Sequence, residues 1–149
     1  MAEKVDSFTF TVEGVPVAKA RPRKAKDGHF YTPQKTKDHE ELIQQFWMAN
    51  GKKFVEGAIG LLVVFYMPIP KSLSKKQRER VLSGEVPHTS KPDLDNLGKL
   101  IKDSMNECAY KDDSYVVAET FIKVYDLHAR TEITISSMTR TINLEKEDD

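Results

Sequence analysis

The segment "KPDLDNLGKL", residues 91–100, places two aspartates, an asparagine and two lysines within ten positions. Asp93 and Asp95 lie so close in sequence that their charges repel unless a cation lies between them. A further acidic pair, Asp112-Asp113, follows. Mg²⁺ prefers oxygen ligands and binds a few carboxylates together with waters and substrate phosphate. These acids therefore predict a site for one or two Mg²⁺ ions that serve phosphodiester hydrolysis.

Each acid also has a purely structural interpretation. Pro92 favours a helix start, where Asp93 suits the N-cap and Asp95 the first turn. Lys99 and Asp103 follow Asp95 at intervals of four residues, on one helix face. This face is either an exposed row of ion pairs or a surface on which Lys99 contacts a phosphate held at Asp95.

Basic residues are concentrated in the N-terminal half of the chain. Residues 1–80 hold 15 lysines and arginines against 9 acids, whereas residues 81–149 hold 8 against 14. Such asymmetry favours an anionic partner for the first half. The candidate DNA-binding residues between positions 19 and 31 are Lys19, Arg21, Arg23, Lys24, Lys26, Phe30 and Tyr31. The alternatives are a solvated charged loop and an aromatic pair that anchors it to the core.

The hydrophobic pattern predicts the elements that position these residues. Residues 7–14 alternate as a half-buried strand, and an extended basic loop leads to a helix over 36–50. Residues 58–67 form an apolar run that predicts a central strand buried on both faces. Ser72 or Ser74 caps a short helix, and a longer helix spans 93–108.

Two strands close the predicted fold, within "YVVAETFIKVY" and "ARTEITISSM", joined as a hairpin at residues 126–128. The order predicts a single α+β domain over residues 1–140, a mixed or mostly antiparallel sheet with helices packed on it. The acidic residues 141–149 are expected to be a disordered tail.

Composition excludes several classes of protein. No apolar run approaches the roughly 20 residues of a membrane helix, and the charged N-terminus lacks a signal-peptide pattern. The single cysteine excludes an internal disulfide and a cysteine-based zinc site. The four histidines show no ligand spacing. We expect a cytoplasmic protein without a membrane partner or a small-molecule cofactor.

The motifs in combination resemble the RusA family of crossover junction endodeoxyribonucleases, the Holliday junction resolvases. The resemblance rests on "KPDLDNLGKLIKDSM" and "KDDSYVV", with "GVPVAKARPR" and "FYTPQKT" near the N-terminus, and runs from about Phe8 to Met138. It implies a Mg²⁺-dependent homodimer that cuts four-way DNA junctions symmetrically in recombination and repair. Candidate dimer surfaces are the Phe8/Phe10 strand and the helix carrying Trp47, although both positions also suit a core.

The resemblance also implies individual roles. It assigns metal binding and catalysis to Asp93, Asp95 and Asp113, and the essential lysine to Lys99. Supporting positions are Asn96, Asp103 and Asp112, and the role of Asp103 stays open.

Two features depart from the family pattern. Tyr115 stands where the family usually has glutamine, which changes the support of Asp113. Lys91-Pro92 replaces an arginine run before the motif, so we expect residues 19–37 to take over phosphate contacts there.

Three other functions fit the same residues without the resemblance. One is a non-catalytic DNA-binding module in which the acids only cap helices. Another is a metal-dependent nuclease with a different branched substrate or an RNA substrate. The third is a protein-interaction domain whose basic loop binds an acidic partner.

Overall fold

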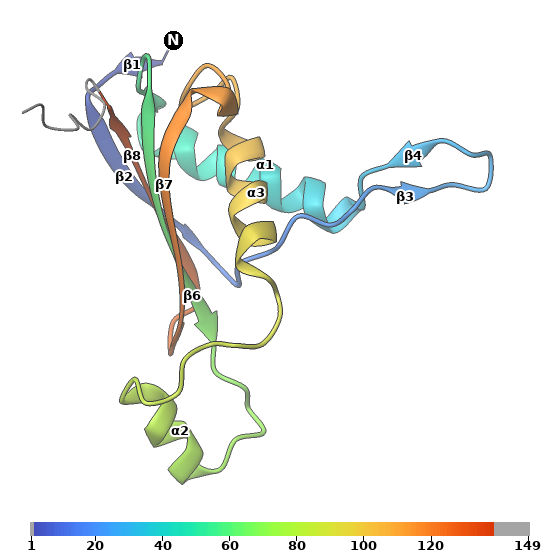
Figure 1. Cartoon of the computed structure of the whole chain (residues 1–149), viewed down its shortest axis with the longest axis vertical. Helices are drawn as coiled ribbons and strands as arrows, with labels where there is room; N and C mark the ends of the chain where they lie inside the picture. The colour runs from blue at the N-terminus through green and yellow to red at the C-terminus, as the bar shows by residue number, and fades with distance from the viewer. Residues whose placement is uncertain (1, 139–149) are drawn as a thin grey trace, which may run out of the picture.

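A four-stranded mixed sheet forms the centre of the computed structural model, which describes residues 2–138 (Figure 1). The strand order is β2-β8-β6-β7, with β2 at Ser7–Glu13, β6 at Ile59–Pro68, β7 at Val116–Asp126 and β8 at Arg130–Ser137. β8 runs antiparallel to both β2 and β6, whereas β6 and β7 are parallel. The predicted α+β class and mixed sheet are confirmed.

Two helices cover one face of this sheet, α1 at Gln34–Ala49 and α3 at Leu94–Met105 (Figure 1). The core lies between these helices and the sheet. It includes the alternate side chains Phe8, Phe10 and Val12 of β2, as the period-two pattern predicted. The third helix, α2 at Lys75–Leu82, lies beyond the end of the sheet (Figure 1).

The prediction that the apolar strand is buried on both faces is wrong. β6 is central, but buried and more exposed residues alternate along it. Leu62, on the face without helices, is 41% exposed. Its continuous apolar sequence therefore reflects a central position in the sheet, not two covered faces.

The predicted hairpin of the last two strands is also wrong. β6 lies between β7 and β8 and pairs with both. Residues 127–129 therefore cross the end of β6, a gap of two strand spacings or about 10 Å. Two strands joined by a short connection usually pair with each other, but here the apolar β6 provides a better partner for each of them.

The basic segment is a projecting hairpin, where an extended loop was expected. β3 at Arg23–Lys24 pairs with β4 at Phe30–Tyr31, and the hairpin extends away from the sheet (Figure 1). Gly28 takes a positive φ of 95° in the turn of this hairpin, a conformation that glycine adopts without strain. We call residues 21–31 the basic arm. A second small pair, β1 at Glu3–Lys4 and β5 at Lys53–Phe54, is parallel.

Helix ends follow the sequence signals in part. Ser74 caps α2 through a capping box with Gln77, which confirms one of the two predicted caps. α3 ends at Met105, three residues earlier than expected, because Asn106 leaves helical geometry with a ψ of 130°. The 3₁₀ helix η1, Asp113–Tyr115, then leads into β7.

Phe8, Phe10 and Trp47 are buried in the core of the chain, so their side chains are not a dimer surface. The predicted tail over 141–149 lies outside the described residues. Among residues 2–138, no helix is both long and apolar enough to cross a membrane.

Candidate active site at the start of helix α3

Asp93 and Asp95 present exposed carboxylates at the start of α3. Asp93 is the N-cap residue, but its side chain accepts no capping hydrogen bond. Asp95 lies in the first turn. Across residues 2–138, neither carboxylate forms an ion pair. The capping interpretation therefore does not account for the Asp93 carboxylate, and these oxygens fit a Mg²⁺ ion that takes one or two carboxylates.

Lys99 lies one helical turn beyond Asp95 and is exposed. In the described part of the chain its ammonium contacts neither Asp95 nor Asp103 within ion-pair distance. The row of ion pairs considered for this helix face is therefore absent there. Lys99 leaves its positive charge available to a phosphate.

Lys123 holds the chain just before the two acids, a role that the sequence did not predict. Its Nζ on β7 donates to the carbonyl oxygens of Ser90 at 2.7 Å and Pro92 at 2.9 Å. These bonds attach the start of α3 to the sheet and fix the position of Asp93. No sequence signal could reveal them, because the acceptors are backbone atoms about thirty residues away.

The second acidic pair lies at the turn before β7. Asp112 accepts hydrogen bonds from the hydroxyl and the backbone N–H of Ser114, at 3.2 Å from the latter. The side-chain bond, with the backbone bond, lowers the pKa of Asp112. Asp113 opens η1 and is exposed. Asp112 thus shapes the turn, while Asp113 presents its carboxylate outward.

The two acidic pairs lie at opposite ends of α3 in a single chain. Lys123, near the end of β7, contacts the start of α3, whereas Glu119, near the beginning of β7, pairs with Lys102 at 3.2 Å. About 20 Å of strand separates Asp113 from the Lys123 contact. Residues 2–138 contain no group of three acidic, histidine or cysteine side chains that could hold a metal ion. The resemblance assigned Asp93, Asp95 and Asp113 to metal binding, but in a single chain Asp113 lies apart from the other two.

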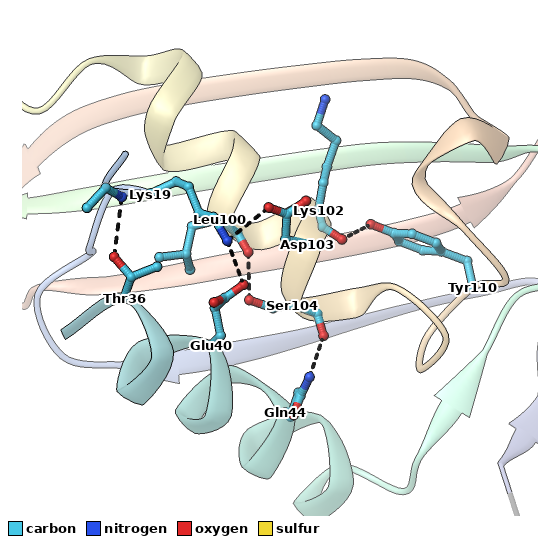
Figure 2. Close-up of polar contacts among 10 residues, drawn as sticks. Lys19, Thr36, Glu40, Gln44, Leu100, Lys102, Asp103, Ser104 and Tyr110 are labelled. Carbon is cyan, nitrogen blue, oxygen red and sulfur yellow. Dashed lines mark hydrogen bonds and ion pairs between the residues drawn. The ribbon is translucent and has the colours of Figure 1, made fainter. Parts of the chain in front are cut away.

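Tyr110 connects the second acidic pair to α3. Its hydroxyl donates to the Lys102 carbonyl oxygen at 2.9 Å (Figure 2). Burial, with the nearby Asp113 carboxylate, raises the pKa of Tyr110, so the hydroxyl keeps its proton. Tyr110 therefore fixes the turn that carries Asp113 against the second half of α3.

A part-buried ion network joins the chain just before the basic arm to α3. Figure 2 shows Lys19 between two carboxylates, with its Nζ 3.3 Å from Glu40 on α1 and 3.1 Å from Asp103 on α3. Burial alone would lower the pKa of Lys19, but these acids raise it above its ordinary value. The Lys19 backbone N–H also donates to the Asn96 carbonyl oxygen at 2.8 Å.

This arrangement suggests a structural role for two residues that sequence motifs had singled out. Lys19 was a candidate DNA contact, but only 19% of its side chain is exposed. Asp103, whose role was open, holds it in place. The DNA-binding assignment of Lys19 stays a prediction.

The basic arm itself is exposed, apart from the half-buried Ala25. Phe30 is 68% and Tyr31 42% exposed, so this pair does not anchor the arm to the core. Arg23 and Lys24 lie opposite the two aromatic residues in the hairpin. Arg21 and Lys26 are exposed as well. The arm thus presents both cations and aromatic rings to a partner.

Comparison with known proteins identifies the family. The model of the family "Endodeoxyribonuclease RusA" matches residues 13–136. The chain belongs to the RusA endodeoxyribonuclease family. It is therefore related to nucleases that hydrolyse DNA. It is also 36% identical over 137 residues to "Uncharacterized protein YqaN" of Bacillus subtilis (strain 168), covering 88% of this chain and 96% of that protein.

The RusA match includes the candidate acids, Lys99 and all of the basic arm. Tyr115, the departure from the usual glutamine, is half-buried beside the core, and the Lys111 Nζ lies 5.5 Å from its ring centroid. Lys91 and Pro92 come just before Asp93, the N-cap residue of α3. The roles assigned to individual residues of this RusA chain stay predictions.

Proposed function

We propose that the chain is a Mg²⁺-dependent homodimeric endonuclease that resolves four-way DNA junctions by paired, symmetric cuts in recombination and repair. The observation that carries the proposal is the pair of exposed carboxylates at the start of α3, with the exposed Lys99 one turn away, in a chain of the RusA family. Carboxylates in this setting suit Mg²⁺ and the phosphate that it binds.

Each group in the site has a distinct part. Asp93 and Asp95 hold the metal, which supplies stabilisation of negative charge on the reacting phosphate. Lys99 donates hydrogen bonds to that phosphate as its charge develops. Asn96 supports the helix start, because its backbone carbonyl oxygen accepts a hydrogen bond from the backbone N–H of Lys19. The basic arm binds backbone phosphates, and its aromatic residues stack on unpaired bases.

The separation of the two acidic pairs supports the proposed dimer. Asp113 is the third family acid, yet it lies at the far end of α3 from Asp93 in one chain. A second copy related by a two-fold axis can bring its acids beside those of the first, and such a dimer matches the two-fold symmetry of a four-way junction. Two opposed cuts then follow from two equivalent sites.

The test is cleavage of an end-labelled synthetic four-way junction with and without Mg²⁺, beside a linear duplex. We expect paired nicks that require Mg²⁺ and that Asp95→Asn abolishes, while junction binding survives or tightens as repulsion from phosphate falls. The matched control is Asp6→Asn, which replaces an exposed acid near the start of β2. This variant should cut the junction at the normal rate.

Other outcomes would replace the proposal. Normal cutting by Asp95→Asn would place the metal elsewhere. Tight, Mg²⁺-independent binding without a nick would indicate a non-catalytic DNA-binding module. If flaps or RNA in a substrate panel are cut faster than the four-way junction, the protein is still a nuclease but its substrate is a different one.

A further inference from the structure

A cleft of about 690 Å³ opens beside Asp93. Its walls come from the chain around Val17, the start of α1, the end of β6 and the loop before α3. Asn96 on α3 and Tyr125 on β7 complete it. The volume lies within the range of pockets that bury a small molecule, such as a single nucleotide.

The lining combines the three chemical groups that a nucleotide requires. Val17 and Met67 provide apolar surface, on which a base can pack. Arg23, Lys35 and Lys91 provide positive charge, and in residues 2–138 none of them forms an ion pair. The cations therefore remain available to phosphate, while the apolar wall excludes water from the base.

His88 lines this cleft and carries a buried ring nitrogen that has no hydrogen-bond partner in the described residues. Only 8% of the residue is exposed, and its buried Nδ1 has no hydrogen-bond partner in residues 2–138. The ring packs against Tyr125 with centroids 4.7 Å apart. A buried polar atom without a partner costs free energy, which a ligand's polar edge offsets.

The charge state of His88 favours a base over a phosphate. Burial first, and then the nearby Lys123, lower the pKa of His88, so the ring is neutral near pH 7. A neutral imidazole has one N–H donor and one acceptor nitrogen, the pair of groups that a base edge presents. The neighbouring lysines and Arg23 are better partners for the anionic part of a nucleotide.

We propose that this cleft holds the nucleotide next to the phosphate that is cut, and that His88 contacts the edge of its base. The inference rests on the proposed function, and it adds a determinant of sequence preference to the same site. A junction is suited to such a subsite, because bases at its centre are already partly unpaired and cost little to extrude.

The experiment maps cut positions on a four-way junction whose mobile homologous core brings many different sequences to the crossover. We expect the wild-type protein to prefer certain nucleotides beside the cut. His88→Phe keeps the ring that packs on Tyr125 but removes its hydrogen-bonding atoms. This variant should reduce the ratio of cutting between favoured and disfavoured nucleotides about fivefold or more, the lower end of the range for loss of a base contact. The cutting rate summed over all positions should change less.

The matched control is His39→Phe. His39 is also 8% exposed, but it does not line this cleft. Its replacement should leave the preference unchanged. His88→Gln is the second variant, because it retains a donor and an acceptor and should keep a sequence preference if His88→Phe fails to fold. An unaltered preference in His88→Phe, or a wild-type protein that cuts every sequence equally, overturns the inference.

A binding measurement separates the subsite from the proposed activity. Imidazole resonances of ¹⁵N-histidine-labelled wild-type protein are followed by NMR as 5′-phosphorylated dinucleotides of each base are added. We expect the His88 resonances to shift for some bases more than others, with His39 unaffected. No shift at His88 in a protein that cuts junctions overturns the subsite alone. Absence of junction cutting by the wild type removes the proposed function as well.

Discussion

Replacement of Lys99 on α3 can show whether this residue serves catalysis or only DNA binding. It is exposed and unpaired within residues 2–138, whereas Lys102 on the same helix pairs with Glu119. We expect Lys99→Met to slow single-turnover junction cutting by about 10²–10³-fold, the usual effect of removing one donor to a developing charge. Junction affinity should change little, because one phosphate contact among many is lost.

Lys102→Met is the control, since it removes the same charge from α3 outside the proposed site. It should cut at nearly the normal rate. Equal losses in both variants would mean that α3 needs positive charge in general and that Lys99 has no special part.

At the residue scale, the sequence could predict groups that carry chemistry themselves. The "PDLDN" motif identified Asp93 and Asp95, and the structure leaves both carboxylates exposed. It could not predict Lys123 or His88. Lys123 acts through backbone carbonyls, and His88 matters only because distant segments close a cleft around it.

Gly98 controls how closely α3 approaches β7. A Cβ added there would lie 2.2 Å from Cε2 of Phe121, so the ring must move. We expect Gly98→Ala to lower the free energy of unfolding by about 1–3 kcal/mol, because overpacking outweighs the gain in helix propensity. Thermal and urea unfolding measure the change.

Phe121→Leu in the Gly98→Ala background is the matching rescue. The smaller side chain should restore part of the lost stability, since the added methyl group then has space. Additive losses in the double variant would contradict a direct contact between the two positions.

The ion network between Lys19 and Asp103 holds the base of the basic arm against α3. We expect Lys19→Met and Asp103→Asn to destabilise the fold, and the double variant to lose less than their sum by about 0.5–1 kcal/mol. The salt dependence of junction binding should stay unchanged in Lys19→Met if the residue is a structural brace.

Arg21→Ala combined with Arg23→Ala provides the comparison. Loss of two phosphate contacts should flatten the slope of log affinity against log salt by about 2. A similarly flattened slope in Lys19→Met would instead support the DNA contact that the sequence suggested.

Elements were predictable where local signals determine them. The alternation in β2 and the capping serine of α2 each depend on a few neighbouring residues. The pairing of β7 with β6 was not predictable in this way. It depends on which distant strand provides the better partner, and a short turn suggested the wrong one.

The whole molecule is proposed to act as a two-fold dimer, and mixed dimers can test this. We expect a dimer of one wild-type chain and one Asp95→Asn chain to nick a single strand of the junction, because each intact site cuts one strand. Differently tagged chains, purified as the heterodimer, allow the cuts on both labelled strands to be counted.

The control is a dimer of two wild-type chains that carry the two different tags and are purified in the same way. It should cut both strands. Paired cuts by the mixed dimer would mean that one site acts twice. Complete inactivity would mean that both Asp95 residues serve each cut.

The position of β8 also has a consequence for synthesis of the chain. Its partner β2 is made first, yet within the described sheet β2 pairs only with β8, with Ser7 opposite Ser136. A chain still on the ribosome therefore carries β2 without its sheet partner until β8 has been translated. Such late pairing makes folding slow and nearly all-or-none, and premature stop products before Arg130 become substrates for chaperones and proteases.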